Sequence, residues 1–121
     1  MFDITRYFNA YWTDGDRFPF VCRVQSKICG FALVRRLQVD LFSIAEFFVM
    51  RGYRRTGVGK HFAFALFNSF RGNWSVAQEE ENVPAQLFWK KVIGEYTRDN
   101  FREAYSASQP KGPKLVFSNF Q

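Results

Sequence analysis

The order of the elements expected along this chain predicts a mixed α/β domain, in which helices flank a central sheet. Three observations support this fold class. Strands and helices alternate after an initial hairpin, one apolar run is typical of a central strand, and the length of 121 residues fits a single compact domain. We therefore expect one domain over residues 1–121.

The N-terminal third is expected to contain a helix and a hairpin. Residues 3–12 are aromatic and polar and predict one short helix, which the turn at residues 13–16 ends. Residues 18–24 and 28–35 predict the two strands of a hairpin, because only a short loop separates them. Residues 36–41 continue as a loop or as further strand.

The middle of the chain is expected to hold the central strand and the first long helix. Residues 42–50 (FSIAEFFVM) carry aromatic side chains on both faces, which predicts a strand buried on both sides. Residues 57–70 are rich in Phe and Ala and predict a buried helix. Gly72 is suited to a left-handed cap after that helix, and residues 74–78 predict a short strand.

The C-terminal third is expected to hold one more helix and one more strand. Pro84 suits the first turn of a helix that runs to about residue 93. Residues 98–108 leave the choice of element open. A turn at residues 110–113 precedes a last strand at residues 115–117.

Composition excludes several classes of protein. The 16 Phe, 5 Tyr and 3 Trp residues are far too many for a disordered polymer. Mean hydropathy is -0.26, and no apolar run approaches the roughly 18 residues that span a bilayer, so we expect no membrane protein. One His and two Cys residues provide neither a multi-histidine nor a four-thiolate site, so we expect no metal. The first residues lack a signal-peptide pattern, which predicts a cytoplasmic protein.

The balance of charge favours an anionic partner. The net charge is +6 and the pI is near 9.6. Nucleic acid, a membrane surface and a phosphorylated cofactor all qualify as partners of such a protein. The position of the basic residues therefore has to decide among them.

Basic residues and glycines coincide in one turn, which we call the phosphate cradle (residues 54–60). Gly57 and Gly59 lie at the expected helix start, where amide N–H groups carry partial positive charge and suit a phosphate or pyrophosphate. Arg54, Arg55 and Lys60 supply neutralising charge. The spacing fits neither a P-loop, whose Lys is missing here, nor a dinucleotide fingerprint, whose third Gly is missing.

This segment resembles a motif of the GNAT superfamily of acyl-CoA-dependent N-acetyltransferases. Residues 54–59 (RRTGVG) match the family's R-x-x-G-x-G element, and residues 46–49 (EFFV) are similar to the strand before it. Residues 82–85 (NVPA) resemble the family's N-x-x-A helix start. Together the three segments cover roughly residues 42–93. The resemblance implies a mainly antiparallel central sheet, splayed at the strand 42–50, and acetyl-CoA as the acyl donor.

The resemblance also implies which residues contact the cofactor. They come from the strand end, the phosphate cradle and the later helix start, and are Phe48, Val49, Met50, Arg54, Arg55, Thr56, Gly57, Val58, Gly59, Lys60 and Asn82. The N–H of Val49 is the candidate for polarising the thioester carbonyl. The alternatives are plain strand pairing for residues 48–50, a solvated basic face for the cradle and a helix cap for Asn82.

Glu46 is the candidate catalytic base. By simple alternation it shares a face with Ile44 and Phe48. A partly buried carboxylate at that place would accept a proton from an ammonium acceptor through water. The alternative is a salt bridge to Arg35 or Arg36.

The chain departs from the family pattern in two places. Trp89 stands where family members usually have a Tyr that protonates the leaving thiolate, and an indole is not a useful acid. Tyr96 is the candidate to replace that acid, with core packing as the alternative. Only 17 residues precede Phe18, where family members place a strand and two helices that help to wall the acceptor pocket. The short N-terminus favours a homodimer.

The sequence therefore predicts an N-acetyltransferase that moves an acetyl group from acetyl-CoA to a primary amine of a small molecule or peptide by direct attack. A non-catalytic acyl-CoA-binding module is the first alternative. A basic nucleic-acid-binding protein ranks below both, because the basic cluster coincides with a glycine turn. Cys22 and Cys29 would face each other across the hairpin and are expected as reduced thiols, with a cross-strand disulfide as the alternative.

Overall fold

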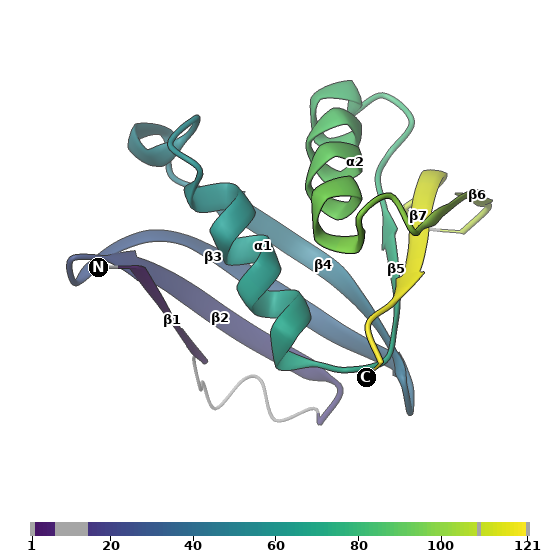
Figure 1. The fold of residues 1–121 in the computed structure, drawn as a ribbon, viewed down its shortest axis with the longest axis horizontal. Coiled ribbons are helices and arrows are strands. Elements are labelled where there is room, and N and C mark those ends of the chain that lie inside the picture. Colours follow the sequence, from purple (N-terminus) through teal and green to yellow (C-terminus); the bar gives the residue numbers. More distant parts are fainter. Residues whose placement is uncertain (1, 7–14, 109, 121) are drawn as a thin grey trace.

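The computed structural model describes residues 2–6, 15–108 and 110–120 of the chain. Figure 1 shows how the elements of these ranges are arranged in space. The strands are β1 (Phe2–Arg6), β2 (Arg17–Val24), β3 (Lys27–Gln38), β4 (Leu41–Val49), β5 (Asn73–Ala77), β6 (Arg102–Ser106) and β7 (Gly112–Ser118). The helices are the 3-10 turn η1 (Arg51–Tyr53), α1 (Val58–Ser69) and α2 (Val83–Thr97).

The strands of these described ranges form one mixed sheet in the order β1-β2-β3-β4-β5-β7-β6. Neighbouring strands are antiparallel apart from β4 and β5, which run parallel. Helices α1 and α2 lie on one side of the sheet (Figure 1). The predicted fold class, a mainly antiparallel mixed sheet flanked by helices, is confirmed.

The N-terminal segment is a strand and not the expected helix. Phe2 and Ile4 alternate with polar residues, and this period of two suits a strand with one face on the core. β1 pairs antiparallel with β2 and places both side chains against the core cluster. The helix prediction is therefore wrong where it overlaps β1, and its remaining part lies outside the described residues.

The predicted hairpin is confirmed as β2 and β3. Its turn residues, Gln25 and Ser26, have φ angles of 51° and 71°. Left-handed backbone at both positions is typical of the tight turns that match the twist of paired strands, here without the usual Asn-Gly signal. β3 continues to Gln38, so residues 36–38 are further strand, which was one of the two alternatives expected for residues 36–41.

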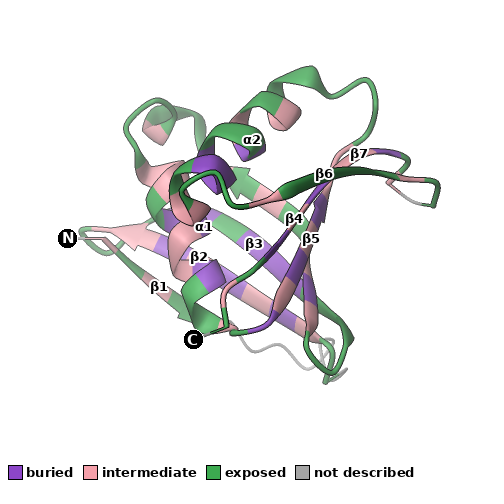
Figure 2. Cartoon of the chain, turned by 45° about the vertical axis from the view of Figure 1, so that its right-hand side comes forward, coloured by how far each residue is buried: buried purple, intermediate pink, exposed green. Residues whose placement is uncertain are grey.

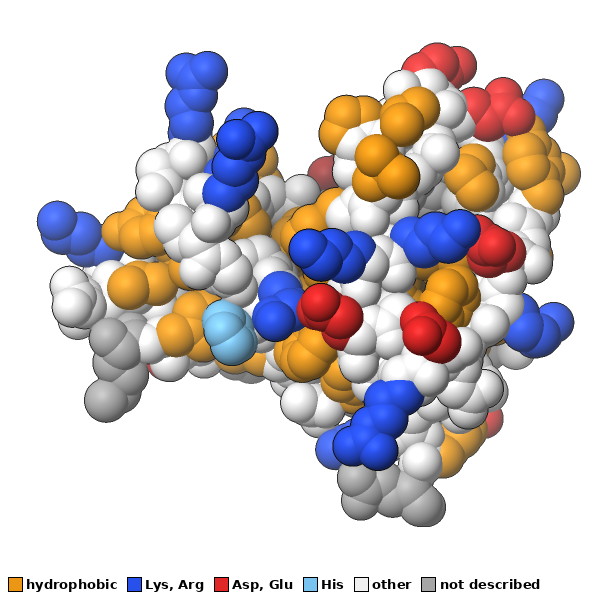
Figure 3. Space-filling model, turned by 45° about the horizontal axis from the view of Figure 1, so that its top comes forward, with side chains coloured by type: hydrophobic (Ala, Val, Ile, Leu, Met, Phe, Trp, Pro, Cys, Tyr) orange, Lys and Arg blue, Asp and Glu red, His pale blue; other side chains and the backbone are white. Residues whose placement is uncertain are grey.

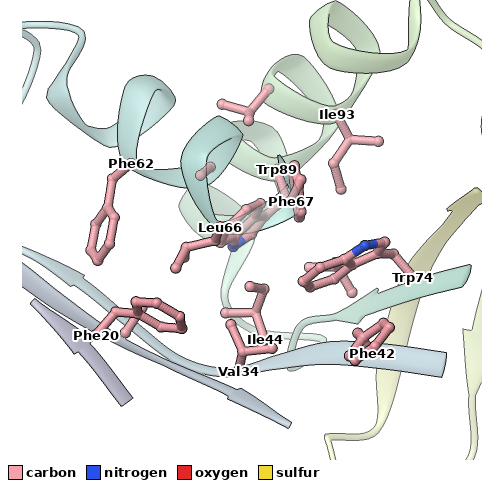
Figure 4. Close-up of a cluster of buried hydrophobic side chains, with 14 of the residues drawn as sticks. Phe20, Val34, Phe42, Ile44, Phe62, Leu66, Phe67, Trp74, Trp89 and Ile93 are labelled. Atoms are coloured by element: carbon pink, nitrogen blue, oxygen red, sulfur yellow. The ribbon is translucent and has the colours of Figure 1, made fainter. Parts of the chain in front are cut away.

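The core lies between the helices and the sheet. Phe62, Leu66 and Phe67 of α1 are fully buried, as the Phe-rich helix predicted. Trp74 of β5 meets Phe67 edge-on, with ring centroids 4.9 Å apart, and Trp89 of α2 is 3% exposed. Figure 4 shows these rings packed above the central strands. Figure 2 shows that the edge strand β6 is mostly exposed, whereas the central strands carry buried residues. Neither helix of the described chain has the length and apolar character needed to cross a membrane.

Strand β4 is buried on one face and not on both. Phe42 and Ile44 are 6% and 8% exposed on the side of the helices. Ala45 and Glu46 are exposed, and Phe48 is 40% exposed. Among the described residues the helices cover only one side of the sheet, so aromatic character on both faces of a strand did not require burial of both.

Gly72 does not adopt the expected left-handed conformation. The residue that follows α1, Phe70, is extended, and the described glycines with positive φ are Gly57 and Gly112. A Cβ atom on Gly72 would lie 2.6 Å from the carbonyl oxygen of Asp40. Glycine is therefore needed here for close approach to the β3–β4 turn.

The C-terminal elements extend beyond their expected bounds. Helix α2 has Pro84 in its first turn, as predicted, and continues to Thr97. The segment that the sequence left open contains the strand β6. Gly112 and Pro113 begin β7 and are not part of a turn, because they pair with β6.

Candidate functional site

Strands β4 and β5 pair only where they begin. Leu41 lies opposite Asn73 and Phe42 opposite Trp74, and no later pair follows among the described residues. Beyond these pairs, a cleft of about 1460 Å³ lies between β4 and β5 and is lined by both helix starts. Figure 3 shows this hollow between the two halves of the molecule. The predicted splay at β4 is confirmed.

Most of the predicted site residues line this cleft. They are Glu46, Phe48, Val49, Arg54, Arg55, Gly57, Gly59, Lys60 and Asn82. Met50, Thr56 and Val58 lie beside them in the chain without lining the cleft. The structure thus brings together three segments that are far apart in the sequence: the end of β4, the start of α1 and the start of α2.

Helix α1 begins at the predicted glycine turn. Gly57 precedes the helix with φ 86°, a left-handed conformation that favours glycine. The hydroxyl of Thr56 accepts a long hydrogen bond, 3.4 Å, from the N–H of Val58 and donates to the carbonyl of Tyr53. The following amides of the first turn have no acceptor within the helix. The positive end of the helix dipole therefore lies at the cleft, where Gly57 and Gly59 line it.

Gly59 has a packing role that the sequence analysis did not identify. A Cβ atom there would lie 3.2 Å from Cε1 of Phe88 and 3.7 Å from Cγ2 of Val49. This glycine lets α1, α2 and β4 meet closely at the floor of the cleft. Close contact between the helices, as well as access for a phosphate, depends on its small size.

The basic residues of the cradle differ in what they already contact. Nε of Arg54 donates to the carbonyl of Val49 at 3.0 Å, and its guanidinium lies 5.6 Å from the centre of the Phe48 ring. Nζ of Lys60 lies 3.6 Å from a carboxylate oxygen of Glu95. Arg55 is exposed and forms no ion pair with any described residue. Arg55 is thus the cradle residue whose charge is most available to an anionic ligand.

The backbone of Val49 points into the opening between β4 and β5. The N–H of the next residue, Met50, donates to the carbonyl of Cys29 on β3 at 2.8 Å. Successive amides of an extended strand point to opposite edges, so the N–H of Val49 points away from β3. The bond from Arg54 to the carbonyl of Val49 agrees with this direction.

A β-bulge interrupts the alternation of β4 just before Glu46. Leu33 of β3 pairs with Glu46, whereas the next residue, Val34, pairs with Ile44. Ala45 is left as an extra residue on β4, which defines the bulge.

The bulge changes the direction in which Glu46 points. The Phe47 ring lies on the side of the helices, 5.2 Å from the Phe62 ring, 5.6 Å from Phe88 and 4.8 Å from Trp89. The side chains of Glu46 and Phe48, on either side of Phe47, therefore point to the open face of the sheet. The prediction that Glu46 shares a face with Ile44 is wrong, because simple alternation fails at a bulge.

The carboxylate of Glu46 is exposed, and the expectation of partial burial is wrong. Neither proposed salt bridge forms: Arg36 pairs instead with Asp16 at 3.1 Å, and Glu46 has no ion pair within the described chain. The carboxylate therefore remains accessible at the wall of the cleft.

The structure does not bring Tyr96 to the cleft. Its hydroxyl donates to Oδ1 of Asn68 at 2.7 Å and accepts from Nδ2 of Asn119 at 3.1 Å. Its ring packs against Phe67, with centroids 5.0 Å apart. This placement favours the alternative that Tyr96 holds the C-terminal segment against α1.

The later helix start contributes Asn82, which caps α2. Its side-chain oxygen accepts from the N–H of Ala85 at 3.3 Å, and the residue also lines the cleft. Capping and a position at the cleft are thus compatible. Trp89 lies deeper, against Phe47, and provides no acid at this wall.

The sequence analysis missed the residues that surround Glu46 on the open face. Phe31 of β3 stacks on Phe48, with ring centroids 5.6 Å apart and planes 30° apart. Leu33 lies directly across from Glu46. Alternation along β3 is visible in the sequence, but the register that brings these residues to Glu46 depends on the bulge.

The two cysteines lie behind this region in the core. Cys22 and Cys29 are free thiols, fully buried, with sulfur atoms 2.7 Å apart. Burial and the neighbouring thiol raise the pKa of Cys22 far above its usual range. A thiol of this kind stays protonated and unreactive at neutral pH.

Solved acetyltransferases share this architecture. The ribosomal-protein-S18-alanine N-acetyltransferase of Escherichia coli matches with a TM-score of 0.71 at 13% identity, over 100% of this chain and 96% of its own. A GNAT-family acetyltransferase of Staphylococcus aureus Mu50 matches with a TM-score of 0.68 at 12% identity, over 98% and 99%. A GNAT-family acetyltransferase of Elizabethkingia anophelis, solved with acetyl-CoA bound, gives 0.64 at 8% identity, over 99% and 98%. At these identities the matches show a common fold.

The family follows from the sequence itself. Residues 2–94 match the model of the Acetyltransferase (GNAT) family. The chain therefore belongs to this family, as its resemblance predicted. Comparison with curated protein sequences gives no match.

Proposed function

We propose that this protein transfers an acetyl group from acetyl-CoA to a primary amine by direct attack of the amine on the thioester. The observation that carries the proposal is the opening between β4 and β5 beside the glycine-capped start of α1. An elongated ligand with a phosphate at one end fits this arrangement, because the free edge of a strand leads to a helix N-terminus. Membership of the family supports the same reaction class.

Each part of the site has a proposed task in holding acetyl-CoA, which supplies an acetyl group activated as a thioester. The first amides of α1 and the guanidinium of Arg55 bind the pyrophosphate. The free edge of β4 at residues 48–50 lies along the pantetheine arm, with Asn82 on the opposite wall. The N–H of Val49 points into the opening and polarises the thioester carbonyl.

Glu46 accepts a proton from the incoming ammonium, through water, on the open face of the sheet. Its exposure suits this task because a substrate and its water can reach it. Trp89 provides no acid for the departing sulfur. None is required, because a thiol of ordinary pKa, about 8.5, is a good leaving group.

Calorimetric titration with acetyl-CoA tests the proposed cofactor site. Gly57→Ala places a side chain at φ 86°, which disturbs the first turn of α1. Gly52→Ala is the matched control, since its Cβ would meet no atom within 4 Å. We expect the wild type and Gly52→Ala to bind alike and Gly57→Ala to bind about tenfold more weakly, because left-handed backbone disfavours a side chain by about 1–2 kcal/mol. Absence of binding by the wild type would overturn the proposal.

A non-catalytic acyl-CoA-binding module is the second candidate. The observation that favours it is Trp89, which is 3% exposed and leaves this wall without an acid. The two candidates differ in the release of free CoA from acetyl-CoA when primary amines are added. Release that depends on the amine supports the transferase, and binding without such release supports the module.

A further inference from the structure

We propose that the acceptor is an amine that carries an aromatic or bulky apolar group, and that Phe31 and Phe48 bind this group while Glu46 faces the ammonium. The inference rests on the proposed function, because Glu46 and Phe48 line the same cleft and Phe31 stacks on Phe48 just outside its lining. The observation behind it is a pair of stacked, exposed rings beside an accessible carboxylate that has no ion pair within the described chain.

The register of the sheet brings these three side chains together. Phe31 pairs with Phe48, and Leu33 pairs with Glu46, on adjacent strands. Phe48 and Glu46 are two residues apart on β4, so their Cα atoms are about 6.5–7 Å apart. Because Phe47 points to the helices, the carboxylate and the Phe48 ring lie on the same open face.

Two exposed rings that stack on one sheet face indicate a binding surface. Phe31 is 49% exposed and Phe48 is 40% exposed, and stacking joins the two rings into one surface. Leu33, in contrast, is 6% exposed and fills the floor beside them. Large exposed apolar patches are uncommon on soluble proteins and mark sites where a ligand or partner binds.

The carboxylate selects the kind of ligand that this surface takes. An apolar surface alone would accept any apolar molecule. With Glu46 beside it, the surface favours a cation that is attached to an apolar group, because carboxylates and aromatic rings both attract ammonium ions. Glu46 and Phe48 also line the cleft between β4 and β5, so a bound ammonium would lie next to the opening that faces Val49.

Arg54 lies against the ring of Phe48 and not against that of Phe31. The guanidinium of Arg54 lies 5.6 Å from the centre of the Phe48 ring and is held by its bond to Val49. Phe31 has no such cation among the described contacts and is the more exposed of the two rings. Phe31 is therefore the residue whose removal should affect the apolar part of the acceptor most specifically.

The test compares two primary amines that share a two-carbon spacer, 2-phenylethylamine and ethanolamine. Binding of each to the protein saturated with CoA is measured by NMR titration, which does not depend on turnover. The variants are Phe31→Ala, Phe31→Trp and the matched control Phe120→Ala. Like Phe31, Phe120 is about half-exposed and lies outside the cleft lining, but it has no described ring contact with Phe48. Acetyl transfer from acetyl-CoA to the same two amines is measured in parallel.

We expect the wild type to bind 2-phenylethylamine about tenfold more tightly than ethanolamine, since partial burial of a ring at about 25 cal/mol per Å² is sufficient for this ratio. Phe31→Ala should remove most of the difference, whereas Phe31→Trp and Phe120→Ala should retain it. Equal affinity for both amines in the wild type, or an equal effect of Phe31→Ala on both, would overturn the inference.

The two arms of the experiment separate this inference from the proposed function. A preference for 2-phenylethylamine without any acetyl transfer would contradict the transferase activity and support the binding surface. Transfer to both amines with no preference in binding would support the transferase activity and contradict the binding surface. If Phe31→Ala instead changes the molecular mass in solution and leaves the preference intact, the surface joins two copies of the chain and the inference is wrong.

Discussion

Two adjacent phenylalanines of β4 lie in opposite surroundings. The ring of Phe47 points to the helices and meets three other aromatic rings. The ring of Phe48 points to the open face, where it contacts Phe31 and the guanidinium of Arg54 and remains 40% exposed. One face of the sheet therefore stabilises the fold, and the other is available to a ligand.

The bulge at Ala45 decides which residues lie on each face. If Ala45 paired regularly with β3 instead of forming a bulge, Glu46 would follow the alternation of Phe42 and Ile44 and point into the helices. A carboxylate in that apolar layer would be strongly destabilising. The bulge thus keeps the charged residue outside and supplies Phe47 to the core in its place.

The largest difference expected between the two faces is in stability. Phe47→Ala should lower the free energy of unfolding by about 3 kcal/mol, because it leaves a cavity among packed rings. Phe48→Ala should lower it by less than about 1 kcal/mol, since its ring is largely outside the core. Urea unfolding of both variants measures this difference. Equal losses would show that the open face is covered in solution.

The next effect concerns activity on the open face. Glu46→Gln should lower kcat for acetyl transfer about 100-fold, because the amide cannot accept the proton of the ammonium. The affinity for acetyl-CoA should not change. Glu103→Gln is the control, since Glu103 lies on the edge strand β6, pairs with Lys90 of α2 at 3.2 Å and does not line the cleft. A similar kcat for Glu46→Gln and wild type would exclude Glu46 as the base.

The sequence predicted those features that depend on local pattern. The glycine turn before α1, the hairpin and the buried Phe-rich helix each follow from residues close together in the chain. The cap at Asn82, also local, was one of the two roles expected for that residue. The strand at Phe2–Arg6 was missed because the sequence analysis assigned residues 3–12 to one helix and did not use the alternation of Phe2 and Ile4 with polar residues. Its pairing with β2 is a tertiary contact.

The features of the site that could not be predicted depend on tertiary packing. The direction in which Glu46 points follows from the bulge, where β4 has one extra residue opposite β3. The amino-acid composition of the strand does not indicate this bulge. The position of Tyr96 follows from hydrogen bonds to Asn68 and Asn119, which are distant in the chain. Closeness to Trp89 in the sequence therefore did not identify a residue that could protonate the leaving thiolate.

A third prediction concerns the two thiols on the packed face. The pKa of Cys22 is raised in the folded protein, chiefly by burial, whereas in the unfolded chain the thiol ionises near its ordinary pKa, about 8.5. Stability is therefore fully present below that pH and falls as the pH rises above it, by about 1.4 kcal/mol per pH unit for one group. Urea unfolding over about two pH units around this pKa, roughly pH 8 to 10, measures how steeply the free energy of unfolding falls with pH.

Cys22→Ala is the matched variant for this prediction. It removes the titrating group, and its stability should fall less steeply with pH than that of the wild type. The half-exposed Tyr105 also has a raised pKa, because it donates to Glu80, and this residue is unchanged in both proteins. Parallel slopes for the two proteins would show that Cys22 ionises in the folded state.

The smallest effect is expected at the ion pair between α1 and α2. Lys60 and Glu95 are both 43% exposed and their charged atoms are 3.6 Å apart, so the pair should contribute less than about 1 kcal/mol to stability. Glu95→Gln releases the ammonium of Lys60 next to the phosphate cradle. Calorimetry should show acetyl-CoA binding about two- to threefold more tightly at low salt, and the gain should disappear at high salt, where exposed charges are screened. Weaker binding by Glu95→Gln would mean that the pair positions the start of α1, and that its role on the packed side of the molecule outweighs its charge.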